Sequence, residues 1–101
     1  MYSDNNKRLN ELVGYIENNL TNKIEYKNLA RIFLFITNVS LAEYIRKRRI
    51  SMAAMDLLKN KERIIDVAIK YVYDSAISFS RAFKKIMGFN PSEIRDNQRY
   101  I

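Results

Sequence analysis

The stretch IIDVAIKYVYDSAISFSRAFKKIMGFNPSEIR, residues 64–95, decides the fold. It predicts a short apolar helix, a polar turn and a second helix over residues 75–87. Along this second helix, apolar residues recur at the i, i+3, i+4 and i+7 spacing that places them on one side; they are Phe79, Ala82, Phe83 and Ile86. The opposite side carries Ile77, Ser78, Arg81, Lys84 and Lys85. Such a helix suits insertion into the major groove of DNA, but an ordinary amphipathic helix with a solvated basic face shows the same pattern.

Length and composition predict a small all-α protein. A chain of 101 residues forms one domain, or two very small ones that share a helix. Its 48% of apolar residues are enough for a core, and it contains two glycines, one proline and no run of strand-like alternation. No segment approaches the roughly 18 continuous apolar residues of a membrane span, and the start does not resemble a signal peptide. We therefore expect a soluble chain in the cytoplasm.

The residue types that usually carry catalysis or hold metal ions are missing. The chain has no histidine and no cysteine, which removes the usual general base, the commonest metal ligand and all thiol chemistry. Asp66, Asp74 and Glu93 could be imagined as acid–base pairs, but each has a simpler role at a helix end or on the surface. We therefore expect no enzymatic activity and no cofactor or metal.

The net charge of +7 lies entirely in the second half of the chain. Residues 1–45 hold five cations and five acids, whereas residues 46–101 hold 13 cations and six acids. A one-sided basic excess is typical of proteins that bind a polyanion. DNA, RNA and an anionic membrane are all polyanions that such a basic surface attracts. Membrane binding through residues 45–49 is disfavoured, because the adjoining apolar face is needed for the core.

The first half predicts two helices. Apolar residues at helical spacing along residues 9–20 predict a first helix, behind a frayed polar lead at residues 2–7. The segment IEYKNLARIF, residues 24–33, predicts a second helix. Asn38 follows, and asparagine suits the left-handed conformation at the end of a helix.

A long helix is then expected over residues 40–60. Ser40 and Glu43 form a capping box at its start, because Ser40 can accept from the N3 amide while Glu43 reaches back. Arg46 opens a run of four cations, RKRR, on one turn. Such a run is either a solvated face or a set of phosphate contacts. Since the four side chains cannot all face one way, any that packs along its aliphatic stem has a structural role.

The two halves of the chain form an internal repeat of unequal length. VSLAEYIR (39–46) matches FNPSEIR (89–95) at an offset of 50 residues. Upstream, NLARIF (28–33) matches DVAIKY (66–71) at an offset of 38 residues. The first repeat is therefore shorter by about twelve residues, which is the length of a helix that reads DNA.

The shortening is expected between Ile32 and Asn38, opposite YDSAISFSRAFKK in the second repeat. The zero net charge of residues 1–45 agrees with the loss of a DNA-reading helix. Two explanations stay open. Either the molecule lacks this segment, or the 101 residues join two parts that a further segment separates.

Residues 64–95 resemble the second helix–turn–helix of the AraC/XylS family of bacterial transcriptional regulators. The resemblance rests on the Y-D-S turn, F-S-R-A-F-K-K, a glycine and P-S-E-x-R, while SLAEYIRKRRISMAA is similar to the family's linker helix and NELVGYIENNL with NLARI to its first two helices. It covers residues 7–95. It implies two homeodomain-like helix–turn–helix subdomains, at residues 7–39 and 61–97, joined by a linker helix at residues 40–60.

The resemblance also implies partners. Members of the family bind successive major grooves of double-stranded DNA, and RNA polymerase is a further candidate partner. Since the first reading helix is absent, reading of a single groove has to be considered. Because the resemblance begins close to Met1, we expect any separate effector-binding domain to follow Ile101.

Two positions depart from the family pattern. Val72 stands where the family has glycine in the turn, and if this position needs a positive φ, a β-branched residue there is strained by on the order of 1–2 kcal/mol. Ala76 replaces the proline that is common after D-S, which loses some pre-organisation of the helix start. Both departures predict a destabilised or degenerate reader.

The resemblance places the base-reading residues at the start of the second reading helix; they are Ala76, Ile77, Ser78 and Arg81. Arg81 can bridge O6 and N7 of guanine. Ile77 either touches a thymine methyl group or packs as a partly buried residue. The expected phosphate contacts position the domain without specifying a base; they are Ser75, Lys84, Lys85, Arg95 and Arg46. Ser75 has a second interpretation as a helix cap. Structural roles are expected for Phe79, Phe83, Ala68, Gly88, Ile86 and Leu57.

Our interpretation is a sequence-specific DNA-binding domain of a bacterial transcription regulator, an activator, that inserts the helix at residues 75–87 into the major groove. The alternative is a protein-interaction module of a regulator, which touches RNA polymerase or dimerises and has weakened DNA binding. Salt dependence separates the two, because phosphate neutralisation makes binding fall steeply with salt.

Overall fold

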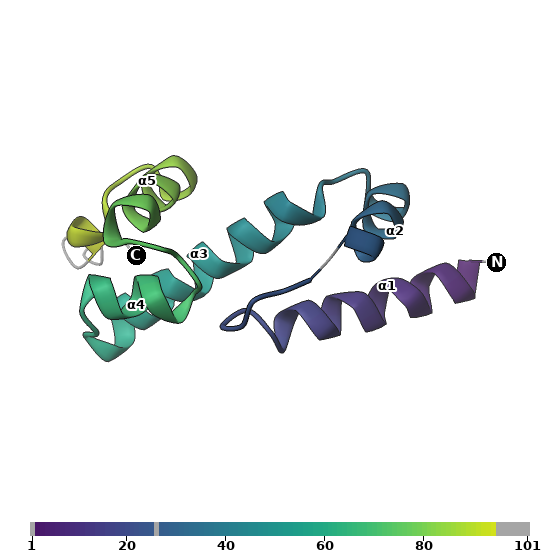
Figure 1. Ribbon diagram of the computed structural model, residues 1–101, viewed down its shortest axis with the longest axis horizontal. Coiled ribbons are helices and arrows are strands. Elements are labelled where there is room, and N and C mark those ends of the chain that lie inside the picture. Colours follow the sequence, from purple (N-terminus) through teal and green to yellow (C-terminus); the bar gives the residue numbers. More distant parts are fainter. Residues whose placement is uncertain (1, 26, 95–101) are drawn as a thin grey trace. The chain divides into compact units, whose positions relative to one another are not determined.

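The computed structural model describes residues 2–25 and 27–94, and every regular element within them is helical (Figure 1). The elements are α1 (Tyr2–Glu17), α2 (Lys27–Thr37), α3 (Leu41–Asn60), α4 (Ile64–Lys70), α5 (Ala76–Met87) and a 3₁₀ turn, η1 (Pro91–Glu93). The all-α prediction is therefore confirmed. The chain divides into two compact units, residues 1–48 (unit 1) and residues 49–101 (unit 2), so α3 contributes one part to each.

Unit 1 has a core of apolar side chains from α1, α2 and the start of α3. The stripe of α1 buries Leu12 and Ile16, and Ile24 is buried in the segment after that helix. Phe33 of α2 is 3% exposed, and its ring centroid lies 5.2 Å from that of Tyr44 on α3. These contacts bring the three helices together around one small core.

One ion pair joins α1 to α3 within unit 1. Nη2 of Arg48 lies 2.6 Å from Oε1 of Glu17, and Nε of Arg48 donates to both carboxylate oxygens at 3.1 Å. The hydrogen bond with Glu17 raises the pKa of Arg48. Burial, with help from Glu17, raises the pKa of the nearby Tyr44 hydroxyl. Arg48 of the predicted cation run therefore has a structural role.

The helix bounds in unit 1 differ from those expected. α1 begins at Tyr2 rather than after a frayed lead, because the lead contains no glycine or proline that would end a helix. α1 ends at Glu17, and Nδ2 of Asn19 donates to the Tyr15 carbonyl at 2.7 Å. α2 covers Lys27–Thr37 instead of residues 24–33, so the apolar LFIT segment is helical.

The connection between α2 and α3 follows the sequence prediction. Asn38 has φ 59°, the left-handed conformation expected at a helix end. Ser40 Oγ accepts a hydrogen bond from the Glu43 amide at 3.0 Å, which is the first half of the predicted capping box. The Glu43 carboxylate pairs with Lys47 Nζ at 3.2 Å.

Unit 2 has an aromatic core behind α5. Phe79 and Phe83 are completely buried. Successive ring centroids along Tyr73, Phe79, Phe83 and Phe89 lie 5.5, 5.7 and 5.8 Å apart, and such pairs stabilise a fold by about 0.5–1.5 kcal/mol each beyond area burial. The other buried apolar residues of unit 2 include Ala53, Leu57, Val67 and Ala68. The structural roles expected for both phenylalanines, Ala68 and Leu57 are confirmed.

A polar cluster ties α4 to α3 within unit 2. The Tyr71 hydroxyl donates to Asp56 Oδ2 at 2.6 Å, and Lys70 Nζ donates to the same oxygen at 2.8 Å. Burial, and then the hydrogen bond with Asp56, raises the pKa of Tyr71 well above its ordinary value. The hydrogen bond with Asp56 also raises the pKa of Lys70.

The turn between α4 and α5 contains a strained valine. Val72 has φ 68°, in the left-handed region, and it is 39% exposed. The Tyr73 amide donates to the Ala68 carbonyl at 2.9 Å and the Val72 amide to the Ile69 carbonyl at 3.0 Å. This is the pair of bonds that closes a helix in a Schellman motif, where the left-handed residue is usually glycine. The strain expected at Val72 is therefore present.

Candidate nucleic-acid interface

Both ends of α5 are fixed by backbone capping. Ser75 is extended, and its Oγ accepts from the Ser78 amide at 3.0 Å while Ser78 Oγ accepts from the Ser75 amide at 3.3 Å. At the other end Gly88 has φ 88°, and its amide donates to the Lys84 carbonyl at 2.8 Å. Glycine is needed there because a Cβ disfavours this conformation. The helix length and start are thus set locally.

The buried phenylalanines fix the rotation of α5 and leave its opposite face exposed. Ile77 is 68% exposed, and Arg81 is also exposed. A shallow hollow of about 320 Å³ lies on this face; its lining residues are Ala76, Ile77, Ser80, Arg81, Lys84 and Asn90. The structure therefore brings together three of the four predicted base-reading residues. The packing alternative for Ile77 does not fit its exposure.

Ser80 and Asn90 were not among the predicted site residues. Ser80 could have been found from the sequence, because it lies three residues after Ile77 and four before Lys84, on the same face of a helix. Asn90 lies beyond the end of α5, and its place in the hollow depends on the turn at Gly88. Helical spacing alone does not predict it.

Ser75 and Ser78 have structural roles at the start of α5. Besides the two capping bonds, Ser75 Oγ donates to Ser78 Oγ at 3.1 Å, and Ser78 Oγ donates to the Ser75 carbonyl at 3.0 Å. Both side chains are half-buried. A contact to DNA from either hydroxyl has to compete with these bonds, so the cap interpretation of Ser75 is the one that this geometry favours.

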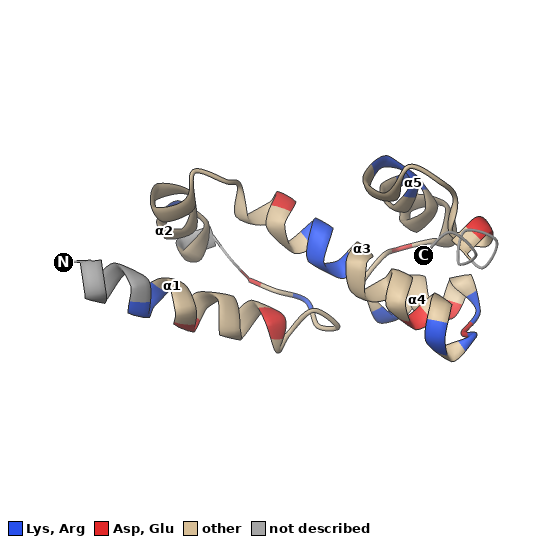
Figure 2. Ribbon diagram, turned by 180° about the vertical axis from the view of Figure 1, so that it is seen from behind, with Lys and Arg blue, Asp and Glu red and all other residues tan. Residues whose placement is uncertain are grey.

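The predicted phosphate contacts lie in different parts of the chain, and Figure 2 shows lysine and arginine positions in blue on both α5 and α3. Lys84 and Lys85 are exposed on the last turns of α5. Arg46 is exposed on α3, in unit 1, whereas the neighbouring Lys47 is held by Glu43. Arg95 lies outside the described residues. Of the four cations in the run, Arg46 is thus the best placed for a partner.

The described residues contain no group of three or more acidic, histidine or cysteine side chains that could hold a metal ion. Among these same residues, no helix is long and apolar enough to cross a membrane. The exposed face of α5 carries a row of cations and the apolar side chain of Ile77. Such a face can neutralise phosphates and contact base edges.

Comparison with known proteins gives the family from the sequence and a matching fold from solved structures. A family model described as a helix-turn-helix domain matches residues 23–97. The transcriptional activator AarP of Providencia stuartii is 38% identical, and the match takes up 86% of this chain and 73% of AarP. The Tn10 TetD protein of Escherichia coli is 36% identical, over 89% of this chain and 73% of TetD.

The match with AarP extends over 98 positions but takes up about 87 residues of this chain, so about eleven positions of AarP have no counterpart here. On fold, a transcriptional regulator of Chromobacterium violaceum with an AraC-type DNA-binding domain matches with a TM-score of 0.82 at 18% identity, over 95% of this chain and 96% of that one. The chain belongs to the helix–turn–helix family of AraC-type transcriptional regulators, and it is a DNA-binding domain of such a regulator.

Proposed function

We propose that unit 2 binds double-stranded DNA in a sequence-specific way by inserting α5 into the major groove. The observation that carries this proposal is the two-faced geometry of α5, in which Phe79 and Phe83 are buried while Ile77 and Arg81 are exposed on the opposite side. A reading helix needs this combination, because its rotation must be fixed before its outer side chains can select bases.

Each residue of the exposed face has a proposed task. Arg81 donates to O6 and N7 of a guanine, which discriminates against other bases by about 1–3 kcal/mol. Ile77 contacts the methyl group of a thymine, and Ala76 allows the backbone of the first turn to come close to the bases. Ser78 adds a weaker base contact through whichever part of its hydroxyl the cap leaves available.

The phosphate contacts position α5 without selecting a sequence. We assign them to Lys84 and Lys85 on α5, to Arg46 on α3 and to Arg95, with Ser75 as a lesser donor. All of these except Ser75 are cations, so their effect on affinity depends on salt: each phosphate neutralised contributes about −0.9 to the slope of log affinity against log salt.

The whole protein then regulates transcription in the bacterial cytoplasm and carries out no catalysis. AarP is described as a transcriptional activator, and we propose the same direction of regulation for this chain, with RNA polymerase as its second partner. A domain that senses an effector is proposed to be separate from these residues. No cofactor takes part in binding.

The proposal is tested by fluorescence anisotropy with a duplex of about 30 base pairs selected from a random library, across a salt series. We expect a steep salt slope for the unaltered protein. Arg81→Ala should weaken binding to the selected site by about 5- to 150-fold and leave binding to random duplex nearly unchanged.

Arg63→Ala is the matched control, because Arg63 is an exposed cation of unit 2 that pairs with Asp66 at 2.9 Å and lies outside the α5 hollow. This variant should keep the sequence preference. Weak binding that hardly changes with salt, or an equal loss in both variants, is incompatible with groove reading through α5.

A further inference from the structure

The internal repeat extends further than residues 39–46, and the structure shows its equivalent positions. RIFLFITN, residues 31–38, matches RAFKKIMG, residues 81–88, at the same offset of 50 residues. Phe33 and Phe83 are both buried. The amide of Asn38 donates to the Leu34 carbonyl at 2.8 Å, and at the equivalent place the amide of Gly88 donates to the carbonyl of Lys84, also at 2.8 Å.

These equivalences place the shortening between Ala30 and Arg31 rather than between Ile32 and Asn38. The absent residues then correspond to residues 69–80 of the second repeat, and the alignment with AarP supports a loss of this size. On this assignment α2 has two parts. Its residues up to Ala30 correspond to the start of α4, and its residues from Arg31 onward correspond to the last turns of α5. Unit 1 therefore retains the end of the reader, with Arg31 in the place of Arg81, and loses the first turn with the counterparts of Ala76, Ile77 and Ser78.

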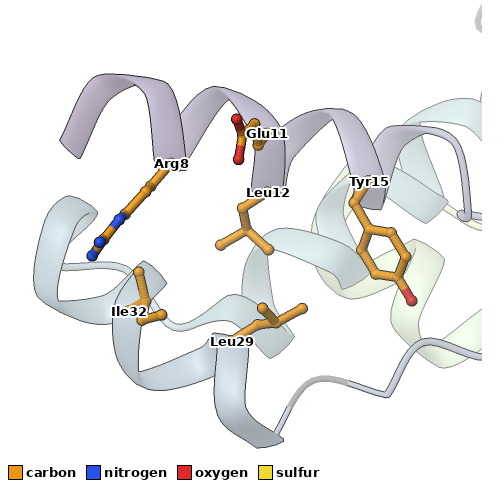
Figure 3. A pocket seen from close by; sticks show the side chains of 6 residues that line it. All are labelled: Arg8, Glu11, Leu12, Tyr15, Leu29 and Ile32. Atoms are coloured by element: carbon orange, nitrogen blue, oxygen red, sulfur yellow. The ribbon is translucent and has the colours of Figure 1, made fainter. Parts of the chain in front are cut away.

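The shortening removes the counterpart of Phe79, the completely buried ring of unit 2. In its place unit 1 has an open groove of about 370 Å³ between α1 and α2 (Figure 3). The apolar side chains of Leu12 and Tyr15 line it from α1, and those of Leu29 and Ile32 line it from α2. Such a groove has the size and lining of a site for an aromatic side chain.

The outer face of α2 has also changed character. Leu34 and Phe35 stand where unit 2 has Lys84 and Lys85. The side chain of Leu34 is 50% exposed and that of Phe35 is 83% exposed. Residues 32–36 are five apolar residues in succession, which at 100° per residue surround the helix completely. A helix that is apolar on all sides is normally buried on all sides, and within unit 1 α2 is not.

We propose that this surface of unit 1 binds a second molecule of the same chain, with α2 packed against α2 across a twofold axis and each Phe35 seated against the groove of the other molecule. A twofold interface requires one surface that carries both the projection and the site that receives it. Phe35 and the groove meet this requirement, because a second hollow connects them; it is lined by Arg8, Arg31, Ile32, Phe35 and Ile36.

The charges at the edge of the groove favour a second molecule over an unrelated apolar partner. Arg8 and Glu11 both line it, and Arg31 lies beside Phe35. Among the described side chains, none of these three has an ion pair within its own molecule. An edge that carries both positive and negative side chains can pair with the same edge of a second molecule turned by 180°. Each Glu11 then faces a cation of the other molecule. This proposal does not depend on DNA binding.

The experiment is sedimentation equilibrium of the unaltered protein from about 1 to 200 µM, the range in which small interfaces associate. We expect the mass to rise with concentration from 12.0 kDa towards twice that value. Phe35→Glu should raise the dimer dissociation constant at least about tenfold, because burying a carboxylate in place of an aromatic anchor is unfavourable. Since Phe35 is exposed, the circular dichroism spectrum should not change.

Ile69→Glu is the matched control, because Ile69 is a 62% exposed apolar residue of α4, in unit 2. It should leave the dimer intact. A charge exchange makes the test specific: Glu11→Arg alone should weaken the dimer, and adding Arg8→Glu should restore it. A protein that stays at 12.0 kDa throughout the range, or a dimer that Phe35→Glu leaves unchanged, overturns the proposal.

Discussion

Residues 31–45 and residues 81–95 come from the same repeat, and the difference between them shows which features of the unit belong to its fold and which to its binding surface. The buried phenylalanine, the left-handed residue at the helix end and the cap of the next turn occur in both. The outer side chains do not. Two lysines on α5 correspond to a leucine and a phenylalanine on α2.

The features that both units keep are those that backbone geometry requires. A helix that ends in a left-handed residue and is followed by a capped turn needs few residue types, so Asn38 with Ser40 and Gly88 with Asn90 satisfy it equally. The outer face has no such constraint, because solvent accepts many side chains. It can therefore change from a cationic surface to an apolar one without loss of the local fold.

The largest predicted effect tests Phe79, the core ring of unit 2 whose counterpart is missing from unit 1. Phe79→Ala should destabilise unit 2 by about 3–5 kcal/mol, because it removes a completely buried ring with two ring neighbours and leaves a cavity. Urea unfolding followed by circular dichroism measures this loss. Ile77→Ala, on the exposed face of the same helix, should change the stability by less than about 0.5 kcal/mol. Similar effects of the two changes would show that unit 2 does not depend on this core.

The next effect concerns the hydrogen bond from Tyr71 to Asp56. Tyr71→Phe should lower the free energy of unfolding at neutral pH by about 1–2 kcal/mol, because Asp56 loses a donor but keeps Lys70. Burial raises the pKa of Tyr71 above its ordinary 10.0. The unfolded chain therefore loses this proton first, and stability is full below about pH 10 and falls as pH rises above it.

Tyr71→Phe should make that alkaline loss smaller. A weaker loss should remain, because Asp56 also raises the pKa of Lys70 and this contribution acts in the same direction. The measurement is urea unfolding at several pH values between about 8 and 11. If the variant and the unaltered protein lose the same free energy of unfolding at alkaline pH, then Tyr71 is not the source of that loss.

A gain of stability is expected at Val72, where unit 2 has a β-branched residue in the left-handed region and unit 1 has Asn38 in the equivalent backbone conformation. Val72→Gly should stabilise the protein by about 1 kcal/mol, which is the relief of strain less the greater flexibility of glycine in the unfolded chain. Val72→Ala, which keeps a Cβ at the same φ, is the control and should gain clearly less. Thermal unfolding measures both, and a loss of stability with glycine would show that the valine side chain contributes packing.

Much of unit 2 could be predicted from the sequence because its motifs are local. Phe79 and Phe83 were assigned to the core from helical spacing, and the strain at Val72 followed from its place in the turn. Ser75 and Ser78 show the limit of this approach. Spacing placed Ser78 on the outer face of α5, but spacing does not reveal that its hydroxyl completes the cap with Ser75.

Unit 1 was predicted less well, for a physical reason. The spacing of Ile24, Leu29, Ile32 and Phe33 predicts its second helix only at residues 24–33. In the structure α2 continues to Thr37. Apolar residues on all sides of a helix have no periodicity, so sequence spacing cannot show which side is buried.

The smallest predicted effects separate Arg46 from Arg48 within the cation run of α3. Arg48 and Glu17 are each about one-third exposed, so their ion pair is partly screened, and Arg48→Met should lower stability by less than about 1 kcal/mol. Arg46→Met should leave stability unchanged, because Arg46 is exposed. On DNA the order reverses: Arg46→Met should make the salt slope shallower by about 0.9 if it loses one phosphate contact, whereas Arg48→Met should hardly change it. Urea unfolding and anisotropy on the same two variants decide the matter. If Arg48→Met changes the slope and Arg46→Met does not, then the Glu17 pair opens when DNA binds, and the phosphate contact belongs to Arg48.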